Sequence, residues 1–183
     1  MENELIGNWK RKTRQTKYNN NWITIFHDEV INPNGGEGIY GVVHFKNLAI
    51  GVIPIDDEGF TWLVGQHRYP QNKFSWEIPE GGGPLGIDPL ESAKRELQEE
   101  VGLAAGNWQL ILEMDLSNSV SDEIALIYIA RDLKQIEQDL DETEVLELNR
   151  IPFQEAYNMV LRGEITDSMS VAGLLRANLV LQI

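Results

Sequence analysis

Three glutamates in the middle of the chain have a spacing that suits metal chemistry. Glu96, Glu99 and Glu100 are separated by three and four positions, so a helix would carry their carboxylates on one face within one turn. Mg²⁺ and Mn²⁺ prefer oxygen ligands and commonly bind phosphates as well. The spacing therefore predicts a divalent-metal site, and the alternative is a solvated acidic face.

The elements around these glutamates would bring them together with backbone carbonyls. Gly81, Gly82 and Gly83 precede them, and a glycine-rich loop permits close approach of a backbone to a ligand. Asp88 is a good N-cap residue and Pro89 suits the first helical position, so we expect a helix over residues 89–101. The apolar residues on its opposite face are Leu90, Ala93, Leu97 and Val101.

The rest of the chain predicts an α+β fold. Short apolar runs between turn residues predict strands at residues 22–30, 40–45, 48–55 and 61–66. Two more strands are expected at 108–114 and 124–130, and two helices at 153–162 and 169–181. Helices would pack on a mixed or antiparallel sheet.

Composition limits the classes of function. A chain of 183 residues with 42% hydrophobic content can form one sizeable core. The net charge of −14 repels phosphate backbones and acidic membranes, so we expect no nucleic-acid or membrane partner. Cysteine is absent and no apolar run is long enough to span a membrane. We therefore expect a soluble protein of the cytoplasm.

The segment that holds the glutamates resembles the Nudix box, which is Gly-x5-Glu-x7-Arg-Glu-U-x-Glu-Glu-x-Gly-U with U aliphatic. The matching residues are Gly81, Arg95, Glu96, Leu97, Glu99, Glu100, Gly102 and Leu103. One position departs, because Ile87 stands where the box has its first glutamate. Either Glu91 takes over the structural pairing with Arg95, or the enzyme is weakened, or the chain binds without hydrolysis.

Flanking segments are similar to the branch of ADP-ribose and nucleoside-diphosphate-sugar pyrophosphatases. They are residues 66–70 (QHRYP), 76–82 (WEIPEGG), 121–123 (SDE) and 153–168. This resemblance implies a Nudix-like α/β/α sandwich with a mixed sheet, plus N-terminal antiparallel strands. Residues 1–45 would be a dimer-forming β segment of the same unit, and residues 46–183 the Nudix hydrolase domain.

The resemblance also implies roles for individual residues. The expected ligands of Mg²⁺, for which Mn²⁺ can substitute, are the Glu80 carbonyl, Glu96, Glu99 and Glu100. The expected substrate contacts are Arg68, Glu77, Gly81, Gly82 and Glu123, although Arg68 and Glu77 could also be ordinary surface and strand-end charges. The expected general base is Glu142, followed by Glu144 and then Glu99. The aromatic residues expected in the core, with stacking on a base as the alternative, are Trp22, Phe26, Tyr40 and Trp76.

The implied reaction is Mg²⁺-dependent hydrolysis of a nucleoside-diphosphate sugar such as ADP-ribose to a nucleoside monophosphate and a sugar phosphate. One alternative is a weak or inactive nucleotide-sugar-binding protein, which Ile87 would permit. Another is a housecleaning hydrolase of nucleoside triphosphates or capped RNA. A homodimer is expected, because the apolar and aromatic residues of 22–30 would otherwise leave a large apolar patch in water.

Overall fold

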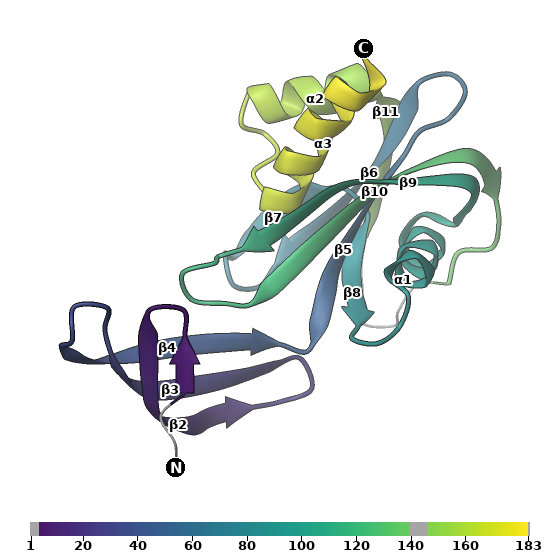
Figure 1. Cartoon of the computed structure of the whole chain (residues 1–183). Coiled ribbons are helices and arrows are strands. Elements are labelled where there is room, and N and C mark those ends of the chain that lie inside the picture. Colours follow the sequence, from purple (N-terminus) through teal and green to yellow (C-terminus); the bar gives the residue numbers. More distant parts are fainter. Residues whose placement is uncertain (1–3, 140–145, 183) are drawn as a thin grey trace. The chain divides into compact units, whose positions relative to one another are not determined.

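The computed structural model describes residues 4–139 and 146–182, which form two compact units (Figure 1). The N-terminal unit comprises Met1–Asn47 and Asp115–Ile124. The larger unit comprises Leu48–Met114 and Ala125–Ile183. Each unit has its own sheet structure, so each is described by itself.

The N-terminal unit is built on an antiparallel sheet in which neighbouring strands follow the chain order. Its strands are β1 (Glu4–Ile6), β2 (Trp9–Asn19), β3 (Ile23–Ile31) and β4 (Glu37–Phe45). The side chain of Asn32 forms the turn between β3 and β4, since its Oδ1 accepts hydrogen bonds from the amides of Asn34 and Gly36. The family resemblance predicted N-terminal antiparallel strands, but the apolar pattern did not locate β2, because β2 is mainly polar and lacks apolar alternation.

The larger unit contains two sheets (Figure 1). The first has the order β8 (Glu80–Pro84), β5 (Asn47–Pro54), β10 (Glu123–Gln135) and β9 (Leu103–Leu116). The second has the order β11 (Glu147–Pro152), β6 (Phe60–Arg68) and β7 (Lys73–Glu77), with antiparallel pairs. Strands β5 and β10 run parallel, in register from Ala125 opposite Ala49 to Ala130 opposite Pro54.

Helices lie on both sides of these sheets (Figure 1). Helix α1 (Pro89–Glu96) continues into the π-helical turn η1 (Leu97–Val101), and it lies on the side opposite α2 (Phe153–Leu161) and α3 (Ser168–Leu181). Helix α3 packs tightly on the sheet, because a Cβ added at Gly173 would lie 3.2 Å from the side chain of Ile127. The predicted α+β class with a mixed sheet is confirmed.

Strand β5 and residues 124–130 of β10 are almost continuously apolar because both of their faces are covered. Their fully buried side chains include Ile50, Val52, Ile53, Ile127 and Ile129. The core prediction is wrong for Trp22, which lies just before β3 and is 65% exposed. Phe26, Tyr40 and Trp76 are half-buried. Among the described residues, no helix is long and apolar enough to cross a membrane.

Candidate active site

The helix that carries the glutamates begins as predicted and ends differently. The Asp88 carboxylate caps α1 by accepting from the amide of Leu90 at 3.0 Å. We predicted a regular helix as far as Val101, and this prediction is wrong for the last turn. That turn is the wider π-helical turn η1, and Gly102 ends it with φ 70°. Apolar periodicity cannot distinguish these two backbones, and π-helical turns are frequent at functional sites.

Two of the three glutamates are buried against the start of β8. Glu96 is 6% exposed and Glu100 is 2% exposed, which excludes a solvated acidic face. The amide of Glu80 donates to Oε2 of Glu100 at 2.8 Å. A Cβ at Gly81 would collide with the Glu96 carboxylate, so only glycine leaves room for that group. The predicted glycine loop is in fact strand β8, whose backbone lies directly on these carboxylates.

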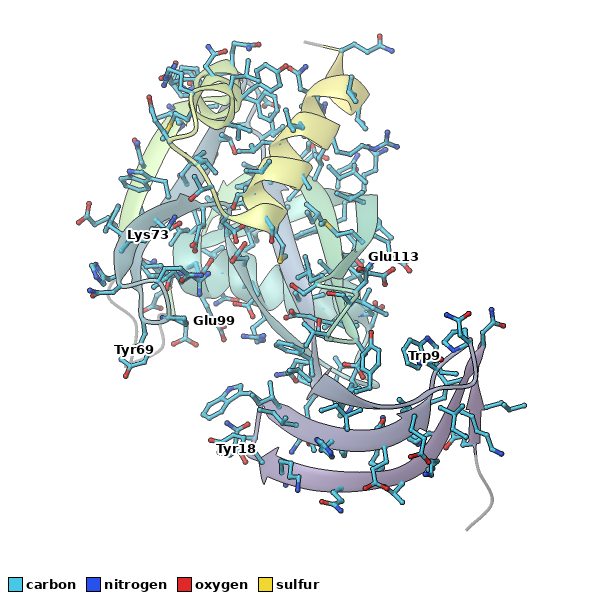
Figure 2. The ribbon with its side chains drawn as sticks, turned by 90° about the vertical axis from the view of Figure 1, so that its left-hand side faces the viewer. Trp9, Tyr18, Tyr69, Lys73, Glu99 and Glu113 are labelled. Carbon is cyan, nitrogen blue, oxygen red and sulfur yellow. The ribbon has the colours of Figure 1, made fainter. Side chains whose placement is uncertain are left out.

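Glu99 is more accessible than the other two, with 28% of its side chain exposed (Figure 2). It forms an ion pair with Arg95, which also binds Oε1 of Glu96 at 2.5 Å and donates to the Gly82 carbonyl at 2.7 Å. Arg95 therefore ties the glutamates of the helix to the backbone of β8.

Ile87, the departure from the box, is 54% exposed just before α1. Glu91, which one of the three alternatives named as a substitute for the missing glutamate, is paired with another residue. Its carboxylate binds Lys94 at 2.6 Å, and no hydrogen bond within 4–139 and 146–182 joins it to Arg95. Asp88 caps the start of the helix, and Arg95 in its last turn binds the Gly82 carbonyl, both without a carboxylate at position 87.

A second group of charges lies where β7 ends and β8 begins. Arg68 donates to both oxygens of Glu77, at 2.6 to 3.0 Å, and to Oε1 of Glu80 at 2.7 Å. Glu77 is 2% exposed, whereas 36% of the Arg68 side chain is exposed. Burial would lower the pKa of Arg68, yet its hydrogen bond with Glu77 and the charge of Glu80 raise that pKa. Arg68 therefore keeps its charge and retains an accessible side.

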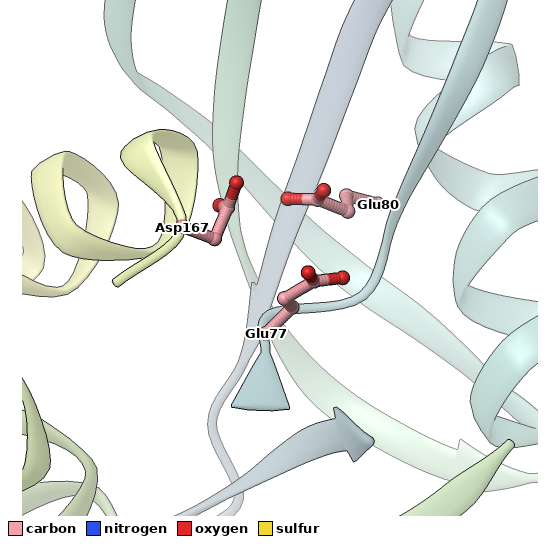
Figure 3. Close-up of side chains that lie close together, drawn as sticks. All are labelled: Glu77, Glu80 and Asp167. Carbon is pink, nitrogen blue, oxygen red and sulfur yellow. The ribbon is translucent and has the colours of Figure 1, made fainter. Parts of the chain in front are cut away.

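Asp167 joins this group from the start of α3 (Figure 3). Its Oδ2 accepts from the amide of Ser170 at 2.8 Å and from the Ser170 hydroxyl at 2.9 Å. Ser170 Oγ in turn accepts from the amide of Ile78 at 2.9 Å. This chain of hydrogen bonds fixes the segment between Glu77 and Glu80. No role was predicted from the sequence for Asp167 or Ser170, although Asp is a preferred N-cap residue and Asp167 lies just before the predicted last helix.

The carboxyl group of Glu80 has an unusual environment. Burial raises its pKa well above the usual range, and the charges of Asp167 and Glu77 raise it further while Arg68 lowers it. Its Oε2 is buried and has no hydrogen-bond partner among the described residues. Buried acceptors without a donor are rare in proteins and point to an absent ligand or proton. The oxygen-rich residues around β8 thus fit a divalent cation.

The remaining predicted residues lie in the N-terminal unit or outside the described residues. Glu123 belongs to the N-terminal unit, where burial and then the charge of Asp122 raise its pKa. Tyr40 also belongs to that unit, where it packs edge-on against Trp9 and borders a cavity of about 310 Å³. The predicted general bases, Glu142 and Glu144, lie outside the described residues.

The mixed sheet between helices and the glutamates packed on a glycine strand define a Nudix-type domain. Comparison with known families agrees, because the NUDIX domain matches residues 45–169. The nucleoside diphosphate sugar hydrolase N-terminal domain matches residues 9–43. The chain belongs to the Nudix hydrolase family, as its sequence predicted.

Individual relatives lie in the predicted branch. The ADP-ribose pyrophosphatase of Mycobacterium tuberculosis is 36% identical over 157 residues, covering 84% of this chain and 75% of the relative. The ADP-ribose pyrophosphatase of Bacillus subtilis is 31% identical, with 80% of each chain covered. A crystal structure of ADP compounds hydrolase has a TM-score of 0.87 and covers 98% of this chain and 97% of its own. At 20% identity that likeness concerns the fold.

Proposed function

We propose that this protein hydrolyses the diphosphate bond of nucleoside-diphosphate sugars, with ADP-ribose as the leading substrate. Water adds across the P–O–P bridge, and the products are a nucleoside monophosphate and a sugar phosphate. The observation that carries the proposal is the burial of Glu96 and Glu100 against the backbone of Glu80 and Gly81. The match to the sugar hydrolase N-terminal domain and the two pyrophosphatase relatives support the substrate class.

The proposed cofactor is Mg²⁺, with Mn²⁺ as a substitute, held by Glu96, Glu99, Glu100 and the carbonyl of Glu80. The donor set supports this assignment, because hard cations prefer carboxylate and carbonyl oxygens. When bound, the ion supplies neutralisation of the diphosphate charge and a more acidic water.

The chain's own residues would bind and orient the substrate. Arg68 keeps its charge and 36% of its side chain is exposed, so its proposed role is to donate to a phosphate oxygen. Glu77 and Glu80 fix the direction of that guanidinium through four hydrogen bonds. Arg95 is bound to Glu96, Glu99 and Gly82, so its role in the proposal is to hold the glutamates in place.

The test is a substrate screen with identified products. Purified protein is incubated in Mg²⁺ with ADP-ribose, other nucleotide sugars, dinucleoside polyphosphates, nucleoside triphosphates and capped RNA, and the products are separated by chromatography. The proposal requires AMP and ribose phosphate from ADP-ribose at the highest rate. Faster cleavage of triphosphates or capped RNA would favour the housecleaning alternative. Calorimetric binding of ADP-ribose without turnover would favour the inactive alternative.

We also propose that the protein is a homodimer of the cytoplasm. The N-terminal unit exposes large apolar side chains, with Leu5 75%, Ile39 70% and Trp22 65% exposed, which a second subunit would cover. Light scattering at micromolar concentration should give twice the chain mass of 20.8 kDa. A mass of 20.8 kDa under those conditions would exclude the dimer.

A further inference from the structure

Three carboxylates from outside the helix that carries Glu96, Glu99 and Glu100 meet at one point of the larger unit (Figure 3). Glu77 ends β7, Glu80 begins β8 and Asp167 caps α3. One oxygen from each lies within 4.8 Å of the others. Residues from three separate elements thus direct like charges towards a common position.

The charges of this cluster do not balance. Among the described residues the positive group paired with these carboxylates is Arg68, which binds Glu77 and Glu80. With all three carboxyl groups ionised, three negative charges and one positive charge leave a net charge of −2. Only 2% of Glu77 and 11% of the Glu80 side chain are exposed, so water screens this charge poorly. The excess equals the charge of one divalent cation.

One atom of the cluster also lacks a partner. Oε1 of Glu80 accepts from Arg68, whereas the buried Oε2 of the same carboxyl accepts from no described group. In Figure 3 the carboxyl of Glu80 lies towards Asp167. A buried carboxylate oxygen without a donor needs a proton or a cation.

The third carboxylate is held firmly in position. Oδ2 of Asp167 is fixed by the amide and hydroxyl of Ser170, and that hydroxyl is fixed by the amide of Ile78. Lys73 ties the neighbouring Thr166 to β7 with a hydrogen bond of 2.7 Å. A ligand set anchored on both sides loses little freedom when an ion binds.

We propose that Glu77, Glu80 and Asp167 form a second divalent-cation site that takes Mg²⁺ or Mn²⁺. Its three carboxylates differ from those assigned above to the helix site, to which Glu80 contributes only its backbone carbonyl, and the proposal does not depend on the proposed substrate. The ion replaces the missing partner of Glu80 and neutralises the charge that Arg68 leaves uncompensated. Hard divalent ions with oxygen ligands match this donor set, because each carboxylate offers several lone pairs.

The experiment counts Mn²⁺ bound to the full chain by electron paramagnetic resonance, after EDTA treatment and desalting. The test variants are Glu80→Gln and Asp167→Asn. Gln keeps an acceptor for Arg68, and Asn keeps the α3 cap, so each removes charge with little change of shape. Asp57→Asn, in an exposed turn, is the matched control. Glu100→Gln identifies the Mn²⁺ that is bound at the helix site, because it removes a carboxylate of that site.

We expect Glu80→Gln and Asp167→Asn each to abolish one Mn²⁺ equivalent, or to weaken it at least tenfold, while the Mn²⁺ that responds to Glu100→Gln remains. Asp57→Asn should bind the same number of Mn²⁺ ions as the wild type, with the same affinity. The midpoint temperature of thermal unfolding, measured without metal, shows whether each variant is folded. Glu80→Gln should keep or raise this midpoint, because one of three like charges is removed. Wild-type Mn²⁺ number and affinity in both folded test variants would overturn the proposal and leave protonation as the state of Glu80.

Discussion

The contact between Gly81 and Glu96 provides a sharp test of the helix site. In Gly81→Ala the new Cβ would lie less than 3.0 Å from three atoms of the Glu96 carboxylate, a separation that real Cβ atoms essentially never show. Ordinary contact begins at 3.4 Å, so the carboxylate must move by more than the difference of 0.4 Å. Metal–ligand distances tolerate only about 0.2 Å. The substitution should therefore displace Glu96 from any ion that it binds.

Folding should largely survive this change, because the atoms that must move are the end of a flexible side chain. We expect metal affinity to fall by about 10- to 100-fold, the usual result of disturbing the support of a ligand. Turnover at limiting Mg²⁺ should fall in parallel and recover partly at high Mg²⁺. The measurements are Mn²⁺ titration by electron paramagnetic resonance and hydrolysis of ADP-ribose as a function of Mg²⁺.

Gly41→Ala is the control, because a Cβ at Gly41 meets nothing within 4 Å. It should bind Mn²⁺ and hydrolyse ADP-ribose as the wild type does. If folded Gly81→Ala keeps wild-type Mn²⁺ affinity and wild-type Mg²⁺ dependence, Glu96 is not a ligand and the helix site is wrongly assigned.

Glu100→Gln should lower turnover by at least about two orders of magnitude, because an anionic ligand is lost while its hydrogen bond from Glu80 can persist; near wild-type rates in Mg²⁺ would refute this role. Ile87→Glu should change turnover less than about fivefold, because an exposed pair contributes at most about 1 kcal/mol; a larger gain would show that the missing box glutamate limits the enzyme. Asp28→Ala should cost about 2–4 kcal/mol of stability in urea unfolding, since the 2% exposed Asp28 binds Arg14 through two hydrogen bonds. Glu29 is its exposed neighbour, and Glu29→Ala should lower the free energy of unfolding by less than about 0.5 kcal/mol. Equal losses of stability in the two variants would contradict the role of burial.

The sequence predicts those elements whose signal is local. The apolar runs of β5 and β10 and the Asp88–Pro89 helix start were found because hydrophobic continuity and capping depend on adjacent residues. The apolar pattern did not locate strand β2, because its side chains are mostly polar and exposed. Strand β8 was not predicted, because three consecutive glycines indicate a loop. In the structure the first of them, Gly81, is needed for the close contact between β8 and Glu96.

In the candidate site, too, only features that depend on neighbouring residues could be predicted from the sequence. Glu96 and Glu100 were recognised by spacing, but their burial depends on β8, which no property of the helix sequence reveals. Asp167 lies far along the chain from Glu77 and Glu80, and only the fold brings their oxygens within 4.8 Å.

The departure at Ile87 can be understood from the contacts of Arg95. This arginine binds the Gly82 carbonyl, Glu96 and Glu99 at once, so β8 and these two carboxylates are joined without any side chain from position 87. A glutamate there would stand in a half-exposed turn, where a further ion pair adds little. Because the carboxylates that are buried all remain, loss of the box's first glutamate is compatible with a complete helix site.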